Sequence, residues 1–155
     1  MTITRCDEKT YDFFVMHESL DVTHFSSKKA GDTFNVERSL RVGDRIDGHF
    51  VSGHIDTMGI VGNIELIPDG SKIVEVEFET QYNTYIIRKG SITINGVSLT
   101  IVEAGDGYLS VSLIPLTQSM TNLGTLNVGD TVNLEFDTMA KYVQKMLSGS
   151  ELQGS

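Results

Sequence analysis

The chain has 155 residues, 39% of them hydrophobic, which suffices for one ordinary core or for a small domain with additional elements. Its formal net charge of −9 argues against a sequence-independent nucleic-acid binder, because such proteins need a basic surface. No apolar run approaches the ~20 residues of a membrane span, no signal peptide is recognisable, and the single cysteine, Cys6, excludes an internal disulfide and fits a reducing compartment, so we expect a cytoplasmic protein.

Short β-rich segments follow one another along most of the chain. In chain order, we expect strands at Thr2–Thr4, Tyr11–Met16, Thr33–Glu37, His49–Ile55, Ile60–Leu66, Ile73–Phe78, Ser91–Ile94, Ser98–Val102, Tyr108–Ile114 and Thr131–Phe136. Gly-Asp or Asp-Gly pairs, which are typical of turns, lie between them at Gly31, Gly43, Asp69, Asp106 and Gly129. This spacing predicts an all-β fold, either a small barrel or a sandwich.

Two segments have helical patterns. Residues 80–88 place Tyr82, Tyr85 and Ile86 on one helical face, although a strand stays open there. Residues 138–147 predict an amphipathic helix, since apolar residues recur at i, i+3, i+4, i+7 and i+8 after Asp137, a natural N-cap. Its apolar stripe packs either on its own barrel or on another chain. The polar tail, residues 148–155, is expected to be disordered.

An ungapped repeat relates the two ends of the chain. Residues 1–39 align with residues 99–137 at a constant offset of 98, and the pattern GDTxNxE occurs at 31–37 and again at 129–135. The second unit extends back to about residue 42, whereas the first is represented only by its last 40 or so residues. Such a piece leaves strand edges unpaired, which favours disorder or pairing with another chain.

The segment GHFVSGHID, residues 48–56, contains two histidines five positions apart. On a regular strand their side chains point to opposite faces, and on a helix they lie about 140° apart. His49 and His54 therefore converge only if the backbone breaks between them, and Gly53 is the expected break. A zinc site built with Asp56 lacks a fourth ligand and the usual spacing. On these residues alone, hydrogen-bonded strand histidines are the favoured interpretation.

Four motifs in this order resemble the riboflavin synthases of the trimeric, tandem-barrel type: GHFVSGHID at 48–56, RKGSITINGVSLT at 88–100, IPLTQSMTNLG at 114–124 and GDTVNLEFDTMAKYV at 129–143. The resemblance covers residues 1–147. It implies six-stranded Greek-key barrels and a C-terminal helix that assembles a trimer. In that arrangement residues 1–41 are the end of a first lumazine-binding barrel, 42–137 form the second barrel, and 138–147 form the oligomerisation helix.

The resemblance also implies a reaction. Two molecules of 6,7-dimethyl-8-ribityllumazine exchange a four-carbon unit, giving riboflavin and 5-amino-6-ribitylaminopyrimidinedione without a metal or a redox cofactor. The implied partners are the substrate, the product, further copies of the chain and lumazine synthase, and neither nucleic acid nor a membrane. In the family the site lies between barrels of neighbouring subunits. Because much of the first barrel is absent, we expect a truncated form with little turnover by this polypeptide alone.

Such a dismutation removes a proton from a methyl group and adds the resulting carbon to a second ring, so groups that titrate near neutral pH suit it. By resemblance, His49 and His54 match the family's paired histidines. Ser98 holds the pteridine and activates a nucleophile or water, and Asp137 supplies a carboxylate besides capping the helix. The substrate-binding residues that the resemblance implies are Gly53, Lys89, Gly96, Ser98, Thr100, Ile114 and Thr117.

Each of these residues also has a plainer interpretation. Ser98 and Thr100 share one face of a strand, and that face can simply be solvated. Lys89 fits a solvated strand end, although its charge also suits a developing negative charge on the substrate ring. Thr117 fits a turn hydroxyl.

Some positions depart from the family pattern: Asn95 stands where Asp is common, Leu116 and Gln118 replace His or Glu, and Cys6 does not match the family cysteine. Three functions remain open. The first is a riboflavin synthase, the second is a non-catalytic lumazine- or flavin-binding protein of the same fold, and the third is a fragment that merely self-associates through residues 138–147. Retention of both histidines, Ser98 and Thr100 favours the enzyme.

Overall fold

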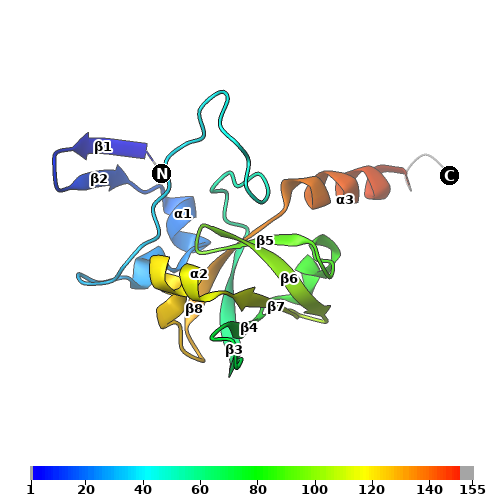
Figure 1. Ribbon diagram of the computed structural model, residues 1–155. Coiled ribbons are helices and arrows are strands. Elements are labelled where there is room, and N and C mark those ends of the chain that lie inside the picture. The colour runs from blue at the N-terminus through cyan, green and yellow to red at the C-terminus, as the bar shows by residue number, and fades with distance from the viewer. Residues whose placement is uncertain (1, 151–155) are drawn as a thin grey trace.

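Alternating apolar and polar residues produce six strands that close into a barrel, shown in a computed structural model that describes residues 2–150 (Figure 1). The strands are β3 Thr57–Leu66, β4 Lys72–Glu77, β5 Ser91–Ile94, β6 Val97–Gly105, β7 Tyr108–Leu113 and β8 Thr131–Phe136. Their order around the barrel is β3-β4-β7-β6-β5-β8, and every neighbouring pair is antiparallel. The predicted all-β fold with a six-stranded Greek-key barrel is confirmed.

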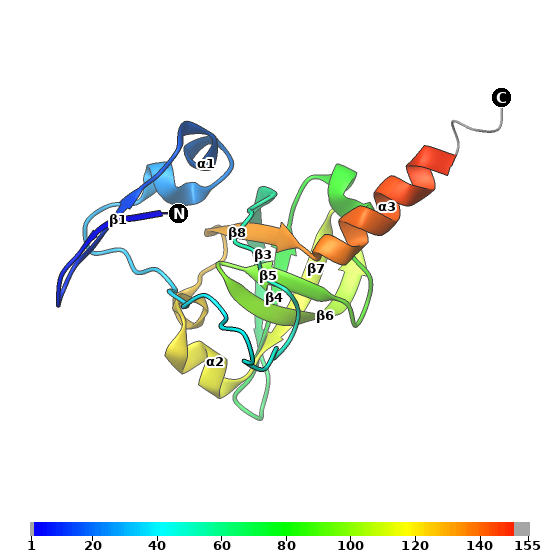
Figure 2. The same ribbon diagram turned by 90° about the horizontal axis from the view of Figure 1, so that it is seen from above.

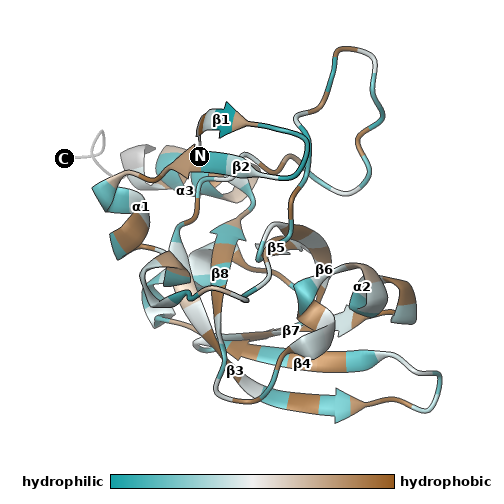
Figure 3. Cartoon of the chain, turned by 90° about the vertical axis from the view of Figure 1, so that its left-hand side faces the viewer, coloured by the Kyte–Doolittle hydropathy of each residue, from teal (hydrophilic) through white to brown (hydrophobic). Residues whose placement is uncertain are grey.

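The barrel interior is aliphatic, and aromatic rings pack where β8 ends. Figure 3 shows apolar and polar segments alternating along β3 and β4, as expected for strands with one buried face. Phe136 ends β8, and Tyr82 of the 3-10 helix η2 (Thr80–Tyr85) stacks on it with ring centroids 5.2 Å apart. The predicted helix over 80–88 is thus this shorter 3-10 helix. Tyr85 packs on Phe136 as well, and the following Ile86 is buried.

Two segments that were predicted as strands lie outside the sheets. The predictions for Thr33–Glu37 and His49–Ile55 are wrong. In the repeat, Thr33–Glu37 corresponds to β8, which pairs with β3 on one side and with β5 on the other. The described N-terminal residues contain no strands equivalent to β3 and β5 that could pair with Thr33–Glu37. The second segment is held to the barrel by side chains rather than by a backbone ladder.

The N-terminal unit, residues 2–38, repeats the local structure of the second half of the barrel. It contains β1 Thr2–Cys6, β2 Tyr11–Phe14, α1 His17–Asp21 and the 3-10 helix η1 His24–Ser27, which correspond in order to β6, β7, α2 Pro115–Met120 and the 3-10 helix η3 Asn122–Thr125. β1 and β2 pair in the same register as β6 and β7 at the offset of 98 residues. A β-bulge interrupts both ladders at the same position, after Ile3 and after Ile101. The register and the β-bulge of the N-terminal hairpin therefore match those of β6 and β7.

Reciprocal asparagine contacts attach the N-terminal unit to the barrel. The backbone N–H of His24 donates to Oδ1 of Asn133 (3.0 Å), and the backbone N–H of Asn122 donates to Oδ1 of Asn35 (2.8 Å). Because His24 corresponds to Asn122 and Asn35 to Asn133 in the repeat, the two bonds are equivalent. The contact between the two copies thus has local two-fold symmetry.

Helix α3, Thr138–Ser150, follows the barrel directly (Figure 2). Oδ1 of Asp137 accepts a hydrogen bond from the backbone N–H of Met139 (2.9 Å), so the predicted N-cap is confirmed. The helix extends three residues beyond the predicted end at 147, into the segment expected to be a disordered tail, and residues 151–155 lie outside the described residues. Its apolar stripe is exposed, at Met139, Tyr142, Val143, Met146 and Leu147. Within residues 2–150, neither α3 nor any shorter helix has the length and apolar content that crossing a bilayer requires.

Candidate ligand-binding site

Three polar side chains form a row on the outer surface of the barrel, across β6, β5 and β8. Because inward and outward residues alternate along a strand, Thr93, Ser98 and Glu135 face away from the aliphatic core. Thr93 is the register partner of both Ser98 and Glu135. Thr93 and Glu135 are nevertheless at most 1% exposed. Another part of the chain must therefore cover them.

The covering segment is residues 48–54, and His49 makes its contact with β5 and β6. Nδ1 of His49 lies 2.8 Å from Oγ of Ser98, and Nε2 lies 3.2 Å from Oγ1 of Thr93. Gly48 allows this close approach, since a Cβ at position 48 would lie 2.5 Å from Oγ of Ser98. Both ring nitrogens of His49 are thus engaged by hydroxyl groups of the barrel.

This arrangement suits proton transfer at Ser98. A neutral imidazole has one N–H and one bare nitrogen, so His49 donates to one hydroxyl and accepts from the other. With the bare nitrogen at Nδ1, His49 takes the proton of Ser98 while Nε2–H donates to Thr93 and fixes the ring. A base oriented by a third group is the arrangement that activates a hydroxyl or a water molecule. The same two bonds also hold the segment on the barrel, so the plainer stabilising role is satisfied as well.

The buried carboxylate of Glu135 anchors the middle of the covering segment. Oε1 accepts hydrogen bonds from the backbone N–H and the side-chain hydroxyl of Ser52, both at 2.7 Å, and Oε2 accepts from the backbone N–H of Gly53 at 3.0 Å. Three donors compensate for removing this carboxylate from water. The segment is therefore attached to β8 as well as to β5 and β6.

The backbone turns at Gly53, between the two histidines. Gly53 has a φ of +77°, in the left-handed region, so the predicted break is present. After the turn, Nδ1 of His54 lies 3.1 Å from Oγ of Ser52, and the ring is exposed. Within residues 2–150, no hydrogen bond joins His54 to His49. The two histidines of this segment thus have different surroundings. The ring of His49 is hydrogen-bonded to two hydroxyl groups, and the ring of His54 is exposed to solvent.

The other predicted site residues surround this segment less closely. Thr100 is exposed on the same strand face as Ser98, and Gly96 forms the β5–β6 turn with a φ of +82°. Lys89 is exposed, and its backbone N–H donates to the carbonyl oxygen of Ile101 (2.8 Å). Ile114 and Thr117 lie at the start of α2. In the described part of the chain, no hydrogen bond joins these side chains to either histidine.

Two carboxylates near the start of α3 have structural partners. Asp137 caps the helix. Asp56 forms an ion pair with Lys141 (2.6 Å) and accepts a hydrogen bond from the backbone N–H of Phe136 (2.8 Å). Among residues 2–150, no group of three or more histidine, cysteine or acidic side chains is placed to hold a metal ion.

Sequence reasoning missed Thr93 and Glu135. Thr93 could have been identified from the sequence, because a hairpin that turns at Asn95-Gly96 places Thr93 directly opposite Ser98. Glu135 gave no such signal. Its alternation with Leu134 and Phe136 predicts a solvated position, and only the irregular segment folded across β8 buries it.

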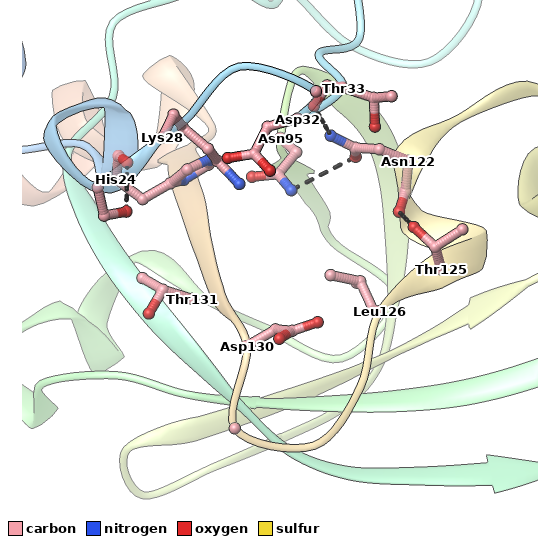
Figure 4. Close-up of a pocket in the computed structure, with 13 residues that line it drawn as sticks. His24, Lys28, Asp32, Thr33, Asn95, Asn122, Thr125, Leu126, Asp130 and Thr131 are labelled. Atoms are coloured by element: carbon pink, nitrogen blue, oxygen red, sulfur yellow. Dashed lines mark hydrogen bonds between the residues drawn. The ribbon is translucent and has the colours of Figure 1, made fainter.

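A polar cavity of about 490 Å³ lies elsewhere, between the N-terminal unit and the barrel (Figure 4). Its lining consists of positions related by the repeat, together with Asn95. Asp32 and Thr33 line one side, and their repeat copies Asp130 and Thr131 line the other. None of residues 48–56 lines this cavity. It marks the junction between the two repeat copies and is separate from the histidine segment.

His24 at this junction is buried, and its Nδ1 has no hydrogen-bond partner in the described part of the chain. Burial lowers the pKa of His24 below its ordinary value, and the nearby charge of Lys28 lowers it further. The imidazole is therefore held in its neutral form. It contributes to the junction by packing against Phe25, with ring centroids 5.7 Å apart.

Residues 52–137 match the protein family described as the lumazine binding domain. A riboflavin synthase of Actinobacillus pleuropneumoniae is 38% identical over 148 residues, which are 95% of this chain and 68% of that protein. A riboflavin synthase of Schizosaccharomyces pombe is 37% identical over 150 residues, covering 95% of this chain and 71% of the relative. The chain thus spans about two thirds of the length of these relatives.

Two solved structures of LumP are also similar to this chain. The crystal structure of LumP complexed with 6,7-dimethyl-8-(1'-D-ribityl) lumazine superposes with a TM-score of 0.75 at 26% identity, covering 86% of this chain and 71% of that one. The structure of LumP complexed with riboflavin gives a TM-score of 0.70 at 28% identity, over 77% of this chain and 64% of that one.

Proposed function

Because the chain belongs to the lumazine-binding family that includes the riboflavin synthases, we propose that its barrel binds 6,7-dimethyl-8-ribityllumazine and catalyses dismutation of this compound to riboflavin. One molecule donates a four-carbon unit and the other accepts it, so riboflavin and the ribitylaminopyrimidine together contain all the atoms of the two substrates. The observation that carries the proposal is the contact of His49 with Ser98 and Thr93.

The geometry of this contact supports a role in proton transfer. Forming the new carbon–carbon bond begins with removal of a proton from a methyl group of one lumazine, which needs an unprotonated base near pH 7, and imidazole is suited to that role. His49 and His54 are the two histidines of the covering segment. We assign the exposed His54 to the exchange of protons with the substrate, and His49 to activation of Ser98 or of a water molecule bound there.

The surroundings of the segment support recognition of a planar ring with a polyhydroxylated chain. Ser98 and Thr100 offer hydroxyl groups on one face of β6, and Gly96 has no side chain in the adjacent turn. Lys89 supplies a positive charge that compensates the anion formed on the ring. Gly53, Ile114 and Thr117 complete the proposed substrate-binding residues, and Asp137 is the proposed site carboxylate.

Fluorescence titration with 6,7-dimethyl-8-ribityllumazine followed by chromatographic detection of riboflavin tests the proposal. We expect binding to the full chain and slow formation of riboflavin. His54→Gln should reduce turnover by about 100-fold or more, the usual contribution of a general acid or base. His17→Gln alters an exposed histidine of α1 and is the matched control. Undiminished turnover in His54→Gln contradicts the assignment of His54, and failure to bind the lumazine contradicts the proposed function.

A second function is favoured by the likeness to LumP, which was solved with a lumazine, with riboflavin and with flavin mononucleotide. In that case the same residues hold a lumazine or flavin without reacting it. Tight binding with no riboflavin formed, even at high protein concentration and long incubation, identifies this function. Release of riboflavin identifies the enzyme.

We also propose that α3 assembles copies of the chain into a trimer. Its apolar stripe is exposed, and burying such a stripe is the usual reason for a terminal amphipathic helix. Met146→Asp should shift the sedimentation coefficient toward that of a smaller species, whereas Gln144→Asp, which lies outside the stripe, should not. Lumazine synthase is the further partner to test, by co-sedimentation. The free, exposed thiol of Cys6 fits our assignment of the protein to the cytoplasm.

A further inference from the structure

The barrel is built from two copies of a three-strand unit. If β3, β4 and β5 are exchanged with β6, β7 and β8, the order of strands around the barrel is unchanged. The β3–β4 pair becomes the β6–β7 pair, and the β3–β8 pair becomes the β6–β5 pair. The β4–β7 and β5–β8 pairs map onto themselves. A two-fold axis therefore passes through the barrel and relates its two halves.

The registers agree with this axis residue by residue. A shift of 40 positions converts the pair Ile60↔Thr131 of β3 and β8 into the pair Thr100↔Ser91 of β6 and β5. It also carries the β-bulge that follows Val61 in β3 onto the bulge that follows Ile101 in β6. The symmetry thus extends to local irregularities and is not limited to strand order.

Backbone hydrogen bonds outside the strands obey the same shift. The N–H of Gly129 donates to the carbonyl oxygen of Val61, and the N–H of Lys89 donates to that of Ile101, both at 2.8 Å. Gly129 and Lys89 both have a positive φ, of 93° and 65°. Lys89 is one of two non-glycine residues with a positive φ among residues 2–150, and its place in the repeated unit accounts for it.

The N-terminal unit is a third copy of this three-strand unit. Its hairpin keeps the register and the bulge, but within residues 2–150 its strands pair only with each other. The side chains equivalent to the buried Ile101, Leu109, Val111, Val132 and Leu134 are Ile3, Tyr11, Phe13, Phe34 and Val36, which are 52%, 61%, 39%, 48% and 80% exposed. Among the described residues, nothing therefore covers this apolar face, and the outer edges of β1 and β2 pair with no further strand.

We propose that two copies of this chain associate through their N-terminal units and form a closed six-stranded barrel at the interface. The barrel within each chain is the template, because it shows that two such units complement each other across a two-fold axis. Around the shared barrel the order is β1, β2, then β2 and β1 of the partner subunit, residues 33–38 of the first chain and residues 33–38 of the partner subunit. In this dimer residues 33–38 become a strand.

The attachment of the N-terminal unit to its own barrel is compatible with this dimer. Asn35 accepts a hydrogen bond from Asn122, and its repeat copy Asn133 accepts the equivalent bond from His24. Asn133 does so while β8 is paired on both sides. Residues 33–38 can therefore join a sheet without giving up the contact that holds them. The proposal is independent of the ligand proposed above.

The symmetry also fixes which residues meet at the axis. The pair Ile94↔Leu134 of β5 and β8 corresponds to Val36 opposite Val36 of the partner subunit. The pair Glu75↔Ser110 of β4 and β7 corresponds to Asp12 opposite Asp12 of the partner subunit. The first pair joins two apolar side chains in the core. The second places two carboxylates side by side on the outer face, which weakens the dimer.

Disulfide trapping of the full chain tests the first pair. Val36→Cys in a Cys6→Ser background should give a covalent dimer on mild oxidation, because directly opposed strand residues have Cα atoms within the range of a disulfide. Val42→Cys in the same background is the control, since Val42 is exposed but lies outside the unit. Association through α3 does not bring the two substituted positions, one in each chain, together. Cross-linking no greater than that of the control overturns the proposal.

Sedimentation equilibrium tests the second pair and the apolar face. Asp12→Asn should lower the dimer dissociation constant by about twofold to fivefold, since it removes repulsion between like charges. Phe13→Asp should abolish the dimer, whereas Phe14→Asp, on the opposite face of β2, should leave it intact. All three variants are compared in the Met146→Asp background, so that α3 does not contribute. Weaker association of Asp12→Asn, or equal effects of Phe13→Asp and Phe14→Asp, contradicts the proposed register.

Discussion

At the scale of single residues, Gly48 decides how closely the histidine segment lies on the barrel. Its α-hydrogen faces Ser98 at a distance where no Cβ fits, and its φ is +99°. Gly43 has a similar φ of +96°, but a Cβ at position 43 would have no other atom within 4 Å. The two glycines therefore share the backbone requirement and differ only in the close contact.

We expect Gly48→Ala to cost more stability than Gly43→Ala. Each substitution places a side chain in the left-handed region, at a cost on the order of 1–3 kcal/mol, but only Gly48→Ala also pushes the segment away from Ser98. Urea unfolding of both variants measures the difference. Gly48→Ala should in addition weaken the binding of ribityllumazine. Equal losses of unfolding free energy in the two variants contradict the importance of the contact.

His24 should make stability depend on pH. Its pKa is lowered in the folded protein, mainly by burial, so the unfolded chain binds the proton more tightly. The stability that neutral His24 provides is complete above about pH 6.5, its unfolded pKa. It is lost as the pH falls from there toward the folded pKa.

Unfolding free energies at pH 7.5 and pH 5.5 check this effect of His24. His24→Asn introduces the residue found at the equivalent position 122 and should show a smaller loss of stability on acidification. The backbone N–H bond to Asn133 is retained in this variant, so a general failure of the junction is not expected. An unchanged pH dependence contradicts the role of His24.

At the scale of secondary-structure elements, the carboxylate of Asp137 caps α3 and is also the proposed site carboxylate. Asp137→Ala should lower the unfolding free energy by about 0.5–2 kcal/mol, because the cap to Met139 is lost. Asp137→Ser keeps a capping oxygen but removes the charge, so it should preserve most of the stability. If Asp137 is also a site carboxylate, Asp137→Ser forms riboflavin more slowly. Full turnover in this variant limits Asp137 to the cap.

The elements also show what the sequence can predict. Period-two alternation identified the barrel strands, because each has a neighbour on both sides and one face in the core. The same signal at Thr33–Glu37 predicted a strand that is absent, since a strand needs partners as well as a pattern. His49–Ile55 failed for another reason: Glu135 and Ser98 hold this segment by side chains, and Gly53 interrupts its alternation.

The candidate site was predictable to a similar extent. The motifs identified His49 and the turn at Gly53, which lie in one short segment. Ser98 is 49 residues from His49 along the chain and was identified through a separate motif. Glu135 was not predictable, because its burial depends on an irregular segment about 80 residues away along the chain. Local periodicity contains no information about such a contact.

At the scale of the whole molecule, the N-terminal hairpin and α3 extend to opposite sides of the barrel (Figures 1 and 2). The N-terminal unit is attached mainly through asparagines. Asn35 accepts a hydrogen bond from the N–H of Asn122 and donates to the carbonyl oxygen of Asn95 and to Oδ1 of Asn122. One side chain thus makes three of the contacts across the junction.

Asn35→Ala should loosen the N-terminal unit while leaving the barrel folded. Amide hydrogen exchange of residues 17–28 should accelerate by about tenfold or more, since losing these bonds costs on the order of 1–3 kcal/mol. Exchange in β4 and β7 should not change. Asn63→Ala, on β3 and away from the junction, serves as the control. Acceleration throughout the barrel contradicts a local role for Asn35.

The two-fold axis of the barrel also determines how many three-strand units are needed to leave none unpaired. A three-strand unit closes a barrel only together with a second such unit, so closed barrels need an even number of units. Residues 2–137 contain three. Within these residues one unit is left over, whatever the stability of the other two. A tandem fourth unit, inserted by design before β1, would make the count even. Such a chain should carry two closed barrels and lose any tendency to pair through its N-terminal hairpin.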